Sequence, residues 1–199
     1  GRDAAESTLQ PLKEGMTNDS FLFAADGQRY IFRYNGQGTE LLIDRGNEKA
    51  VYELLSGDDI TERIVALSID PGYKISYYYE GAHVCDPGNR DEAERCMRAL
   101  RSFHERRLTG AKPFDPFETL AFYEKLMPAE SLNSVEYQEV REEVFSLRSF
   151  LRPFLTDHIT LCHIDSIFDN FLFVEGRERP YLIDWEYAGL SDPLIDIAM

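Results

Sequence analysis

The chain is poor in the features that mark secreted, membrane-spanning and nucleic-acid-binding proteins. Its three cysteines, Cys85, Cys96 and Cys162, are spaced neither as a disulfide framework nor as a metal site, which favours a reducing compartment. No apolar run approaches the length of a membrane span, and the polar N-terminus lacks the apolar segment of a signal peptide. We therefore expect a cytoplasmic protein with no membrane partner.

Basic residues are also scarce. The 21 Lys and Arg face 36 Asp and Glu, giving a formal net charge of -15. Nucleic-acid surfaces need a basic patch, so we expect no nucleic-acid partner. The acidic balance suits a small cationic substrate, because acidic clefts concentrate cations, but acidic proteins are common and charge alone does not decide.

The length and composition allow one large domain or two small lobes. Of the 199 residues, 43% are hydrophobic, which is enough to bury a core. The first part predicts a small antiparallel sheet with one helix, because aromatic and β-branched runs alternate with turn signals such as Asp26-Gly27 and Asp70-Pro71-Gly72. The expected strands are 20–27, 28–36, 63–70 and 73–81, and the expected helix is 39–57.

The second part predicts mainly helices. Apolar residues recur at helical spacing over 91–108, 117–127 and 135–151. The predicted strands give way to predicted helices at a connector that contains Gly and Pro. We place a boundary there, with an N-terminal nucleotide-binding lobe at 1–81 and a C-terminal helical catalytic lobe at 82–199. The fold class is α+β, and small ligands favour such an interface between lobes.

Four polar residues follow the last helix in a suggestive order. The segment "LCHIDSIFDNFLF" reads H-x-D-x-x-x-x-N, and "YLIDWEYAG" places Asp184 after an apolar run. Phosphoryl transfer needs one carboxylate to hold the attacking hydroxyl, which suits Asp165, and oxygen ligands for magnesium, which suit Asn170 and Asp184. Two short strands joined by a polar turn would bring Asn170 and Asp184 together. Such a set can also arise by chance on loops, so the rest of the chain must decide.

Taken together, the motifs resemble those of the choline/ethanolamine kinases, within the aminoglycoside phosphotransferase-like and protein-kinase-like folds. "EGMTNDSFLF" looks like the nucleotide loop of that family, and "GQGTELLIDRGNEKAVYELL" is similar to its G-x-T-E-x-x-I-D-R-x-x-E segment. "LCHIDSIFDNFLF", "LIDWEYAG" and "SDPLIDIA" resemble its later motifs, in the expected order. The resemblance extends from about residue 13 to residue 199 and implies a two-lobed, protein-kinase-like fold.

The resemblance also implies roles for individual residues. Asp165 would be the catalytic base, and Asn170 and Asp184 would hold Mg²⁺. Arg33 would contact the phosphates of ATP, and Glu48 would be its ion-pair partner on the helix. A planar guanidinium can bind phosphate oxygens through two hydrogen bonds at once. Without the motif context, the pair would be ordinary surface charges on a strand and a helix.

Two further assignments concern the loop motifs. The resemblance places Met16, Thr17, Asn18 and Ser20 against the nucleotide, through side-chain hydroxyl or amide groups and backbone N–H groups. The residues alone fit a plain polar turn equally well, because the segment holds one Gly. His163 would be structural and would brace the loop through hydrogen bonds.

Substrate recognition is predicted beside Asp165. A quaternary ammonium has no N–H to donate, so aromatic faces and carboxylates recognise it, and Glu186 and Tyr187 offer both. Trp185 would point the opposite way on an alternating strand, so we assign it to packing. The run Tyr77–Tyr79 has the position of a strand, which favours packing over an aromatic cage.

The chain departs from the family pattern at its end. Family members continue past "DPLIDIAM" with helices that supply aromatic residues to the choline pocket. The resemblance therefore implies a fragment or a short form, with an exposed apolar face that would favour self-association. The sequence predicts an ATP- and Mg²⁺-dependent kinase for choline. The alternatives are a kinase for ethanolamine, an aminoglycoside or another small hydroxyl compound, and a nucleotide-binding fragment without catalysis.

Overall fold

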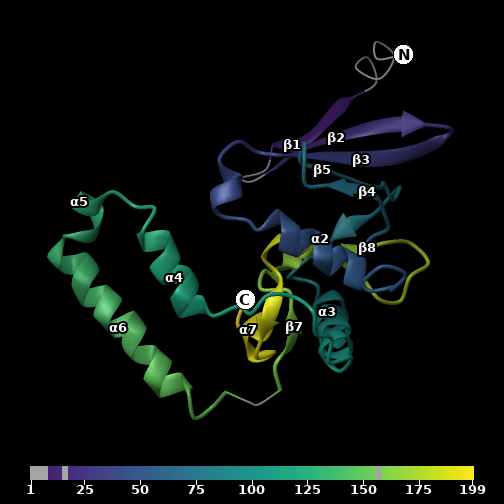
Figure 1. The fold of residues 1–199 in the computed structure, drawn as a ribbon. Helices are drawn as coiled ribbons and strands as arrows, with labels where there is room; N and C mark the ends of the chain where they lie inside the picture. Colours follow the sequence, from purple (N-terminus) through teal and green to yellow (C-terminus); the bar gives the residue numbers. More distant parts are fainter. Residues whose placement is uncertain (1–8, 15–17, 156–157) are drawn as a thin grey trace.

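A five-stranded antiparallel sheet forms the first part of the protein (Figure 1). The computed structural model describes residues 9–14, 18–155 and 158–199. The strands lie in the order β1-β2-β3-β5-β4. Their bounds are β1 (Gln10–Glu14), β2 (Asn18–Ala25), β3 (Gln28–Asn35), β4 (Ile64–Ser68) and β5 (Tyr73–Tyr77).

The turn between β2 and β3 fixes the register of the sheet. Ala25 pairs with Gln28, so Asp26 and Gly27 alone make the turn, with φ of 52° and 76°. Asp-Gly accepts these positive φ values readily, which confirms the predicted hairpin. The same register places Arg33 of β3 directly opposite Lys74 of β5.

The helix that packs on the sheet is shorter than predicted. A 3₁₀ turn, η1 (Thr39–Leu41), comes first, and α2 (Arg45–Leu54) follows it. The Asp44 side chain accepts a hydrogen bond from the Asn47 N–H at 3.0 Å, which makes Asp44 the N-cap. The prediction of one helix from residue 39 was therefore wrong at its start, because the capping residue lies inside the predicted stretch.

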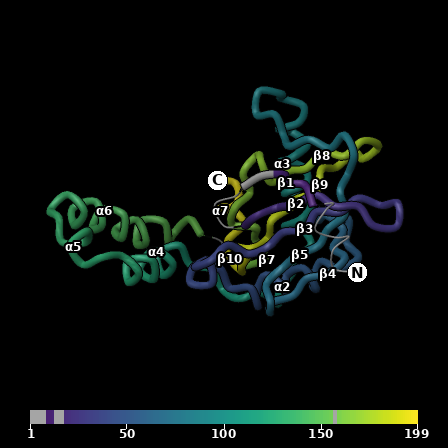
Figure 2. Tube along the Cα trace, turned by 90° about the horizontal axis from the view of Figure 1, so that it is seen from above, coloured from purple at the N-terminus to yellow at the C-terminus, as the bar shows by residue number. Residues whose placement is uncertain are grey.

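The second part contains helices and two small sheets. The helices are α3 (Arg90–His104), α4 (Pro116–Glu124), α5 (Ala129–Leu132), α6 (Val135–Leu151) and α7 (Leu194–Ile197). One sheet has β6 (His83–Val84), β8 (Phe171–Phe173) and β9 (Tyr181–Leu182), and the other pairs β7 (Thr160–Cys162) with β10 (Gly189–Ser191). Helices α4 to α6 form an arm that extends away from the other elements in both views (Figures 1 and 2).

The core joins the two parts. Buried apolar residues of α2, α3, β7, β8 and β9 pack around Trp185. The rings of Tyr77 and Tyr79 pack against Tyr30 and Tyr181, as predicted for packing residues. The division of the chain at residues 81 and 82 stays a prediction. Among the described residues, no helix combines the length and the apolar character that crossing a membrane requires.

Candidate active site

The loop 163–170, which follows β7, is braced by His163. This side chain is fully buried, and its Nε2 lies 2.8 Å from the carbonyl oxygen of Ile183. Its Nδ1 accepts from the N–H of Asp165 at 3.3 Å, so the ring proton belongs on Nε2. Burial lowers the pKa of His163 and keeps the ring neutral. The predicted structural role of His163 is confirmed.

Asp196 holds the backbone of the same loop. Its carboxylate accepts from the N–H groups of His163 at 2.8 Å and Ile164 at 2.7 Å, and it lies 2.8 Å from Nε2 of His104. Ile164 adopts a φ of 71°, which a β-branched residue rarely takes. Sequence reasoning gave Asp196 no role, although the D-P-x-x-D spacing in "SDPLIDIA" marked its position.

Asn170 ties Asp165 to the hairpin that carries Asp184. The Asn170 amide donates to the backbone oxygen of Asp165 at 2.8 Å and to its Oδ2 at 2.9 Å. The backbone carbonyl oxygen of Asn170 accepts a hydrogen bond from the N–H of Ile183 at 2.9 Å, next to the β8–β9 pair. The predicted hairpin is confirmed, and it brings Asn170 close to the backbone of Asp184.

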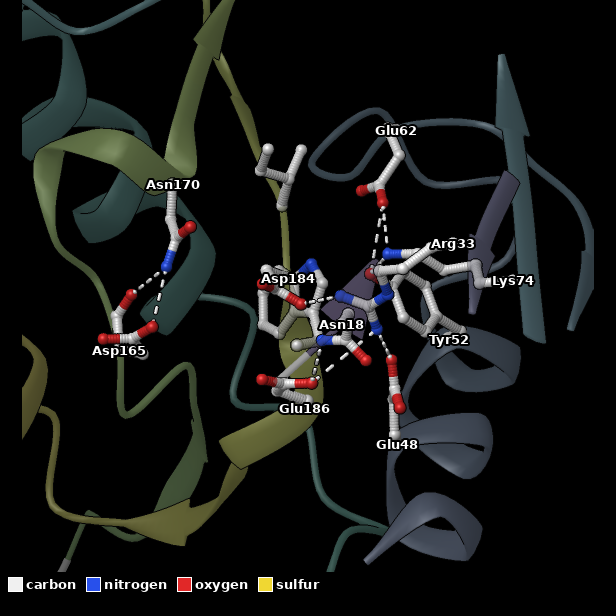
Figure 3. Close-up of polar contacts among 12 residues, drawn as sticks. Asn18, Arg33, Glu48, Tyr52, Glu62, Lys74, Asp165, Asn170, Asp184 and Glu186 are labelled. Carbon is white, nitrogen blue, oxygen red and sulfur yellow. Dashed lines mark hydrogen bonds and ion pairs between the residues drawn. The ribbon is translucent and has the colours of Figure 1, made fainter. Parts of the chain in front are cut away.

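The side chains of Asn170 and Asp184 have different partners in this structure. Figure 3 shows Asn170 turned toward Asp165, whereas Asp184 points to the guanidinium of Arg33. The convergence of Asp165, Asn170 and Asp184 on one ion therefore stays a prediction. For this convergence, Asp184 would have to exchange the guanidinium of Arg33 for the metal ion.

Arg33 is the centre of a buried ion cluster (Figure 3). It forms ion pairs with Glu48 of α2 and with Asp184, and 7% of its surface is exposed. The predicted pairing of Arg33 with Glu48 is confirmed. Burial would raise the pKa of Asp184, but the charges of Arg33 and Lys74 outweigh it and hold the pKa below its usual value. Asp184 is therefore a carboxylate at neutral pH, as a metal ligand must be.

Glu186 belongs to the same cluster. Its Oε2 accepts from Nδ2 of Asn18 at 3.0 Å and from Nη1 of Arg45 at 2.9 Å, and it lies 3.9 Å from Arg33. This carboxylate is 5% exposed and is engaged by residues from β2 and α2. Its predicted contact with the substrate stays a prediction.

Trp185 and Tyr187 share a 3₁₀ turn, η3 (Trp185–Tyr187), where an alternating strand was predicted. The buried Trp185 indole donates to the carbonyl of Leu182 at 2.8 Å and to Oγ1 of Thr61 at 3.0 Å. Its packing role is confirmed, although the reason given for it was wrong. Burial raises the pKa of the Tyr187 hydroxyl to about 12, with further contributions from nearby Glu186, Tyr123 and Asp165.

Beside Arg33 lies a second buried pair that sequence reasoning missed. Nζ of Lys74 donates to Oε1 of Glu62 at 2.9 Å and to the Tyr52 hydroxyl at 2.6 Å (Figure 3). The Tyr52 hydroxyl donates to the same Glu62 oxygen at 3.1 Å. Two-residue periodicity along β5 places Lys74 on one face with buried Ser76, and this was the available signal.

The predicted nucleotide contacts are only partly within the described structure. Met16 and Thr17 lie outside the described residues. Asn18 begins β2 and contacts Glu186 and Arg45, and Ser20 sits directly opposite Arg33 on the adjacent strand. Asn18 and Ser20 thus border the cluster that carries Arg33.

Carboxylate oxygens of Glu48, Asp184 and Glu186 lie within 4.8 Å of one another. They are hard oxygen donors of the kind that magnesium takes from proteins, but in this structure Arg33 and Arg45 pair with them. Asp184 alone of this group is a predicted magnesium ligand, and its role with Asn170 stays a prediction.

Comparisons with known proteins show which family the chain resembles. A model of a phosphotransferase enzyme family matches residues 8–199. Protein LicA of Haemophilus influenzae is 24% identical over 92% of this chain and 55% of its own length. A probable ethanolamine kinase of Arabidopsis thaliana is 25% identical over 83% of this chain and 46% of its own length. The chain thus spans about half the length of these two relatives.

Solved structures show the same fold. The crystal structure of choline kinase LicA from Streptococcus pneumoniae has a TM-score of 0.85 and 33% identity, covering 96% of this chain and 67% of that one. A complex of LicA with AMP has a TM-score of 0.77 and 32% identity, covering 96% and 65%. Aminoglycoside phosphotransferase APH(4)-Ia shares the fold, with a TM-score of 0.67 and 19% identity over 96% and 70%. The predicted protein-kinase-like α+β fold and the predicted family resemblance are confirmed.

Proposed function

Because the chain belongs to this phosphotransferase enzyme family, we propose that it is an ATP-dependent kinase for choline. It would transfer the γ-phosphate to the choline hydroxyl and release ADP and phosphocholine. The support comes from the relatives that are choline or ethanolamine kinases and from the arrangement of Asp165, Asn170 and Asp184.

One observation carries the proposal. Asp165 sits on a loop whose backbone is fixed by Asp196 and His163, and Asn170 fastens that loop to the hairpin bearing Asp184. Phosphoryl transfer depends mainly on such positioning and on charge stabilisation, rather than on covalent chemistry by the protein. A rigid carboxylate next to an acidic hairpin meets that need.

Asp165 would act on the acceptor. Its carboxylate would accept a hydrogen bond from the choline hydroxyl and orient the oxygen toward the γ-phosphorus. The new O–P bond forms as the bond to the β–γ bridging oxygen breaks, and the hydroxyl proton passes to Asp165. ADP leaves with the bridging oxygen.

Arg33 would act on the nucleotide. Its guanidinium can donate to α- and β-phosphate oxygens while Glu48 keeps it in position. Asn170 and Asp184 would hold Mg²⁺, which neutralises phosphate charge when it is bound. Since Asp184 now contacts Arg33, nucleotide binding would redistribute the partners of this carboxylate.

Ethanolamine is the second candidate acceptor, because ethanolamine kinases are among the relatives. An aminoglycoside is a third, supported by the fold shared with APH(4)-Ia. A coupled assay of ADP release over a panel of acceptors, with product identified by phosphorus NMR, tests the proposal. Transfer to choline that disappears in Asp165→Asn, with ATP binding retained, is expected. If no acceptor in the panel is phosphorylated, the kinase proposal is wrong and a nucleotide-binding role remains.

A further inference from the structure

The side chain of Asn47 joins two segments of the second part of the protein. Asn47 lies in the first turn of α2 and is 9% exposed. Its Nδ2 donates to the carbonyl of Ala188 at 2.7 Å, and its Oδ1 accepts from the N–H of Lys112 at 2.9 Å. Main-chain groups therefore occupy both ends of this buried carboxamide. No motif in the sequence assigned a role to Asn47.

The two segments that this side chain joins run parallel to each other. The N–H of Leu190 donates to the carbonyl of Lys112, and the N–H of Phe114 donates to the carbonyl of Leu190, both at 2.8 Å. Gly189 makes this approach possible, because a Cβ there would lie 2.8 Å from Cβ of Phe114. If this parallel ladder continued, its next bond would run from the N–H of Lys112 to the carbonyl of Ala188.

Asn47 takes the place of that next bond. Like a peptide group, its carboxamide offers a donor and an acceptor, and it bridges the N–H of Lys112 and the carbonyl of Ala188. The two main-chain groups are therefore held one amide group apart instead of bonding directly. At this point α2 sets the separation of the two segments.

The segment held by Asn47 begins at Asp184. The turn η3 alone separates Asp184 from Ala188. Asp184 has a φ of 69°, a left-handed conformation that a residue other than glycine keeps only where the surrounding structure enforces it. Before Asp184, the N–H of Ile183 donates to the carbonyl of Asn170 at 2.9 Å. After it, Asn47 fixes the carbonyl of Ala188.

The helix that carries Asn47 is anchored independently of this contact. Glu48, the next residue, pairs with Arg33 of β3, and Val51 of the same helix is fully buried in the core. Removal of the Asn47 side chain should therefore leave α2 in place and release the main chain that follows Asp184.

One other contact from the first turn of α2 reaches the same segment. Arg45 pairs with the side chain of Glu186 at 2.9 Å. Both are long side chains that can follow a shift of the backbone, whereas the short side chain of Asn47 bonds to the main chain directly. Asn47 is therefore the contact that fixes the backbone itself.

We propose that Asn47 is a positioning residue for the magnesium site, because it fixes the main chain after Asp184 and so aims this carboxylate at the ion. The inference rests on the proposed kinase function, in which Asp184 holds Mg²⁺ and Arg33 contacts the phosphates. Asn47 acts through the backbone and needs no contact with the nucleotide or the ion.

Calorimetric titration with ATP, in MgCl₂ and in EDTA, tests the proposal. The ratio of the two affinities, which we call the magnesium gain, reports how well the protein holds the ion on the bound nucleotide. Asn47→Ala should lower the magnesium gain about tenfold, the size expected for the loss of one hydrogen bond. The affinity in EDTA should stay nearly unchanged, because Glu48 still holds Arg33.

Gln138→Ala is the matched control. Nε2 of Gln138 in α6 donates to the carbonyl of Leu132 at 2.6 Å, so this variant also removes a carboxamide from a main-chain carbonyl, but on the arm. Its magnesium gain should equal that of the parent.

Should Asn47→Ala fail to fold, Asn47→Asp supplies the comparison. It keeps the volume of the side chain and the acceptor for Lys112, and it loses only the donor to Ala188. Gln138→Glu is then the charge-matched control. An added carboxylate repels free ATP more than its magnesium complex, so the new charge alone would raise the magnesium gain rather than lower it.

Asp184→Asn separates this inference from the proposed function, because it should abolish the magnesium gain. A parental gain in Asn47→Ala beside a lost gain in Asp184→Asn would overturn the inference and leave the kinase function standing, as would equal losses in MgCl₂ and EDTA. A parental gain in both variants would reject the metal role of Asp184 and the inference with it. A reduced gain in both variants, without transfer to any acceptor, would support the inference and reject the kinase function.

Discussion

Lys74 and Arg33 lie directly opposite each other on β5 and β3, and each of these two buried cations has its own carboxylates. Arg33 pairs with Glu48 and Asp184, whereas Lys74 pairs with Glu62. Adjacent like charges repel in a poorly solvated interior, so the loss of any of these carboxylates or cations leaves a charge without compensation.

Lys74→Met should destabilise the protein. It leaves buried Glu62 with hydroxyl partners but no cation, and breaking a buried pair in this way costs about 3–5 kcal/mol. Urea denaturation measures the free energy of unfolding. The double variant Lys74→Met/Glu62→Met should recover much of the loss. A double variant as unstable as the sum of both single variants would contradict the pairing.

Arg33→Lys should weaken ATP binding more than it affects folding. A lysine keeps the charge but cannot span Glu48 and Asp184 with a planar fork, and it offers phosphates a single point of contact. We expect a loss of about tenfold in affinity by calorimetry, in line with 1–2 hydrogen bonds to a charged group. Arg29→Lys, at the exposed pair with Glu80, is the control and should bind ATP normally.

His163 should make stability depend on pH below about 6.5, the ordinary histidine value. Its folded pKa is lowered, so the unfolded state binds the proton first. The stability is complete above the unfolded pKa and falls as the pH drops, by up to about 1.4 kcal/mol per pH unit. Unfolding measured between pH 7 and pH 5 tests this.

Two variants test whether His163 causes this dependence of stability on pH. His163→Gln should be less stable at pH 7 but should show a flatter profile, while His83→Gln, at a half-exposed ring, should keep the parental slope. A parental slope in His163→Gln would show that another group is responsible.

Asp196→Asn should loosen the loop that carries Asp165. The amide has one acceptor oxygen, so it cannot accept from both N–H groups and face His104 as the carboxylate does. We expect a loss of about 1.5–3 kcal/mol in stability. Transfer should slow with little change in ATP affinity, because Arg33 and Glu48 are untouched. Asp169→Asn, on the same loop but exposed, is the control and should be neutral in both assays.

Much of the fold followed from local signals in the sequence. Asp26-Gly27 forced a two-residue turn, and the short runs around residues 171 and 182 gave the hairpin beside Asp184. Arg33 and Glu48 were paired correctly from their motifs. The start of α2 was misplaced because helical periodicity ran past the cap at Asp44, which only a local backbone criterion identifies.

The rest of the site depends on contacts between distant segments. Lys74 meets Glu62 only after β4 and β5 pair, and Asp196 meets His163 only after α7 folds back on β7. A charged residue on a strand is normally expected to face solvent, and the shared face of Lys74 and Ser76 on β5 was the local signal against that expectation. The contacts of Glu186 with Asn18 and Arg45 also join segments more than a hundred residues apart, so no local pattern could predict them. Its contact with the substrate stays a prediction.

The close approach at Gly189 sets the direction in which α4 leaves the rest of the protein. Any side chain at this position would collide with Phe114 and displace the root of α4. Because α5 and α6 follow α4 in the arm, a single methyl group added at residue 189 would shift the whole arm. The position of three helices therefore depends on a residue that has no side chain.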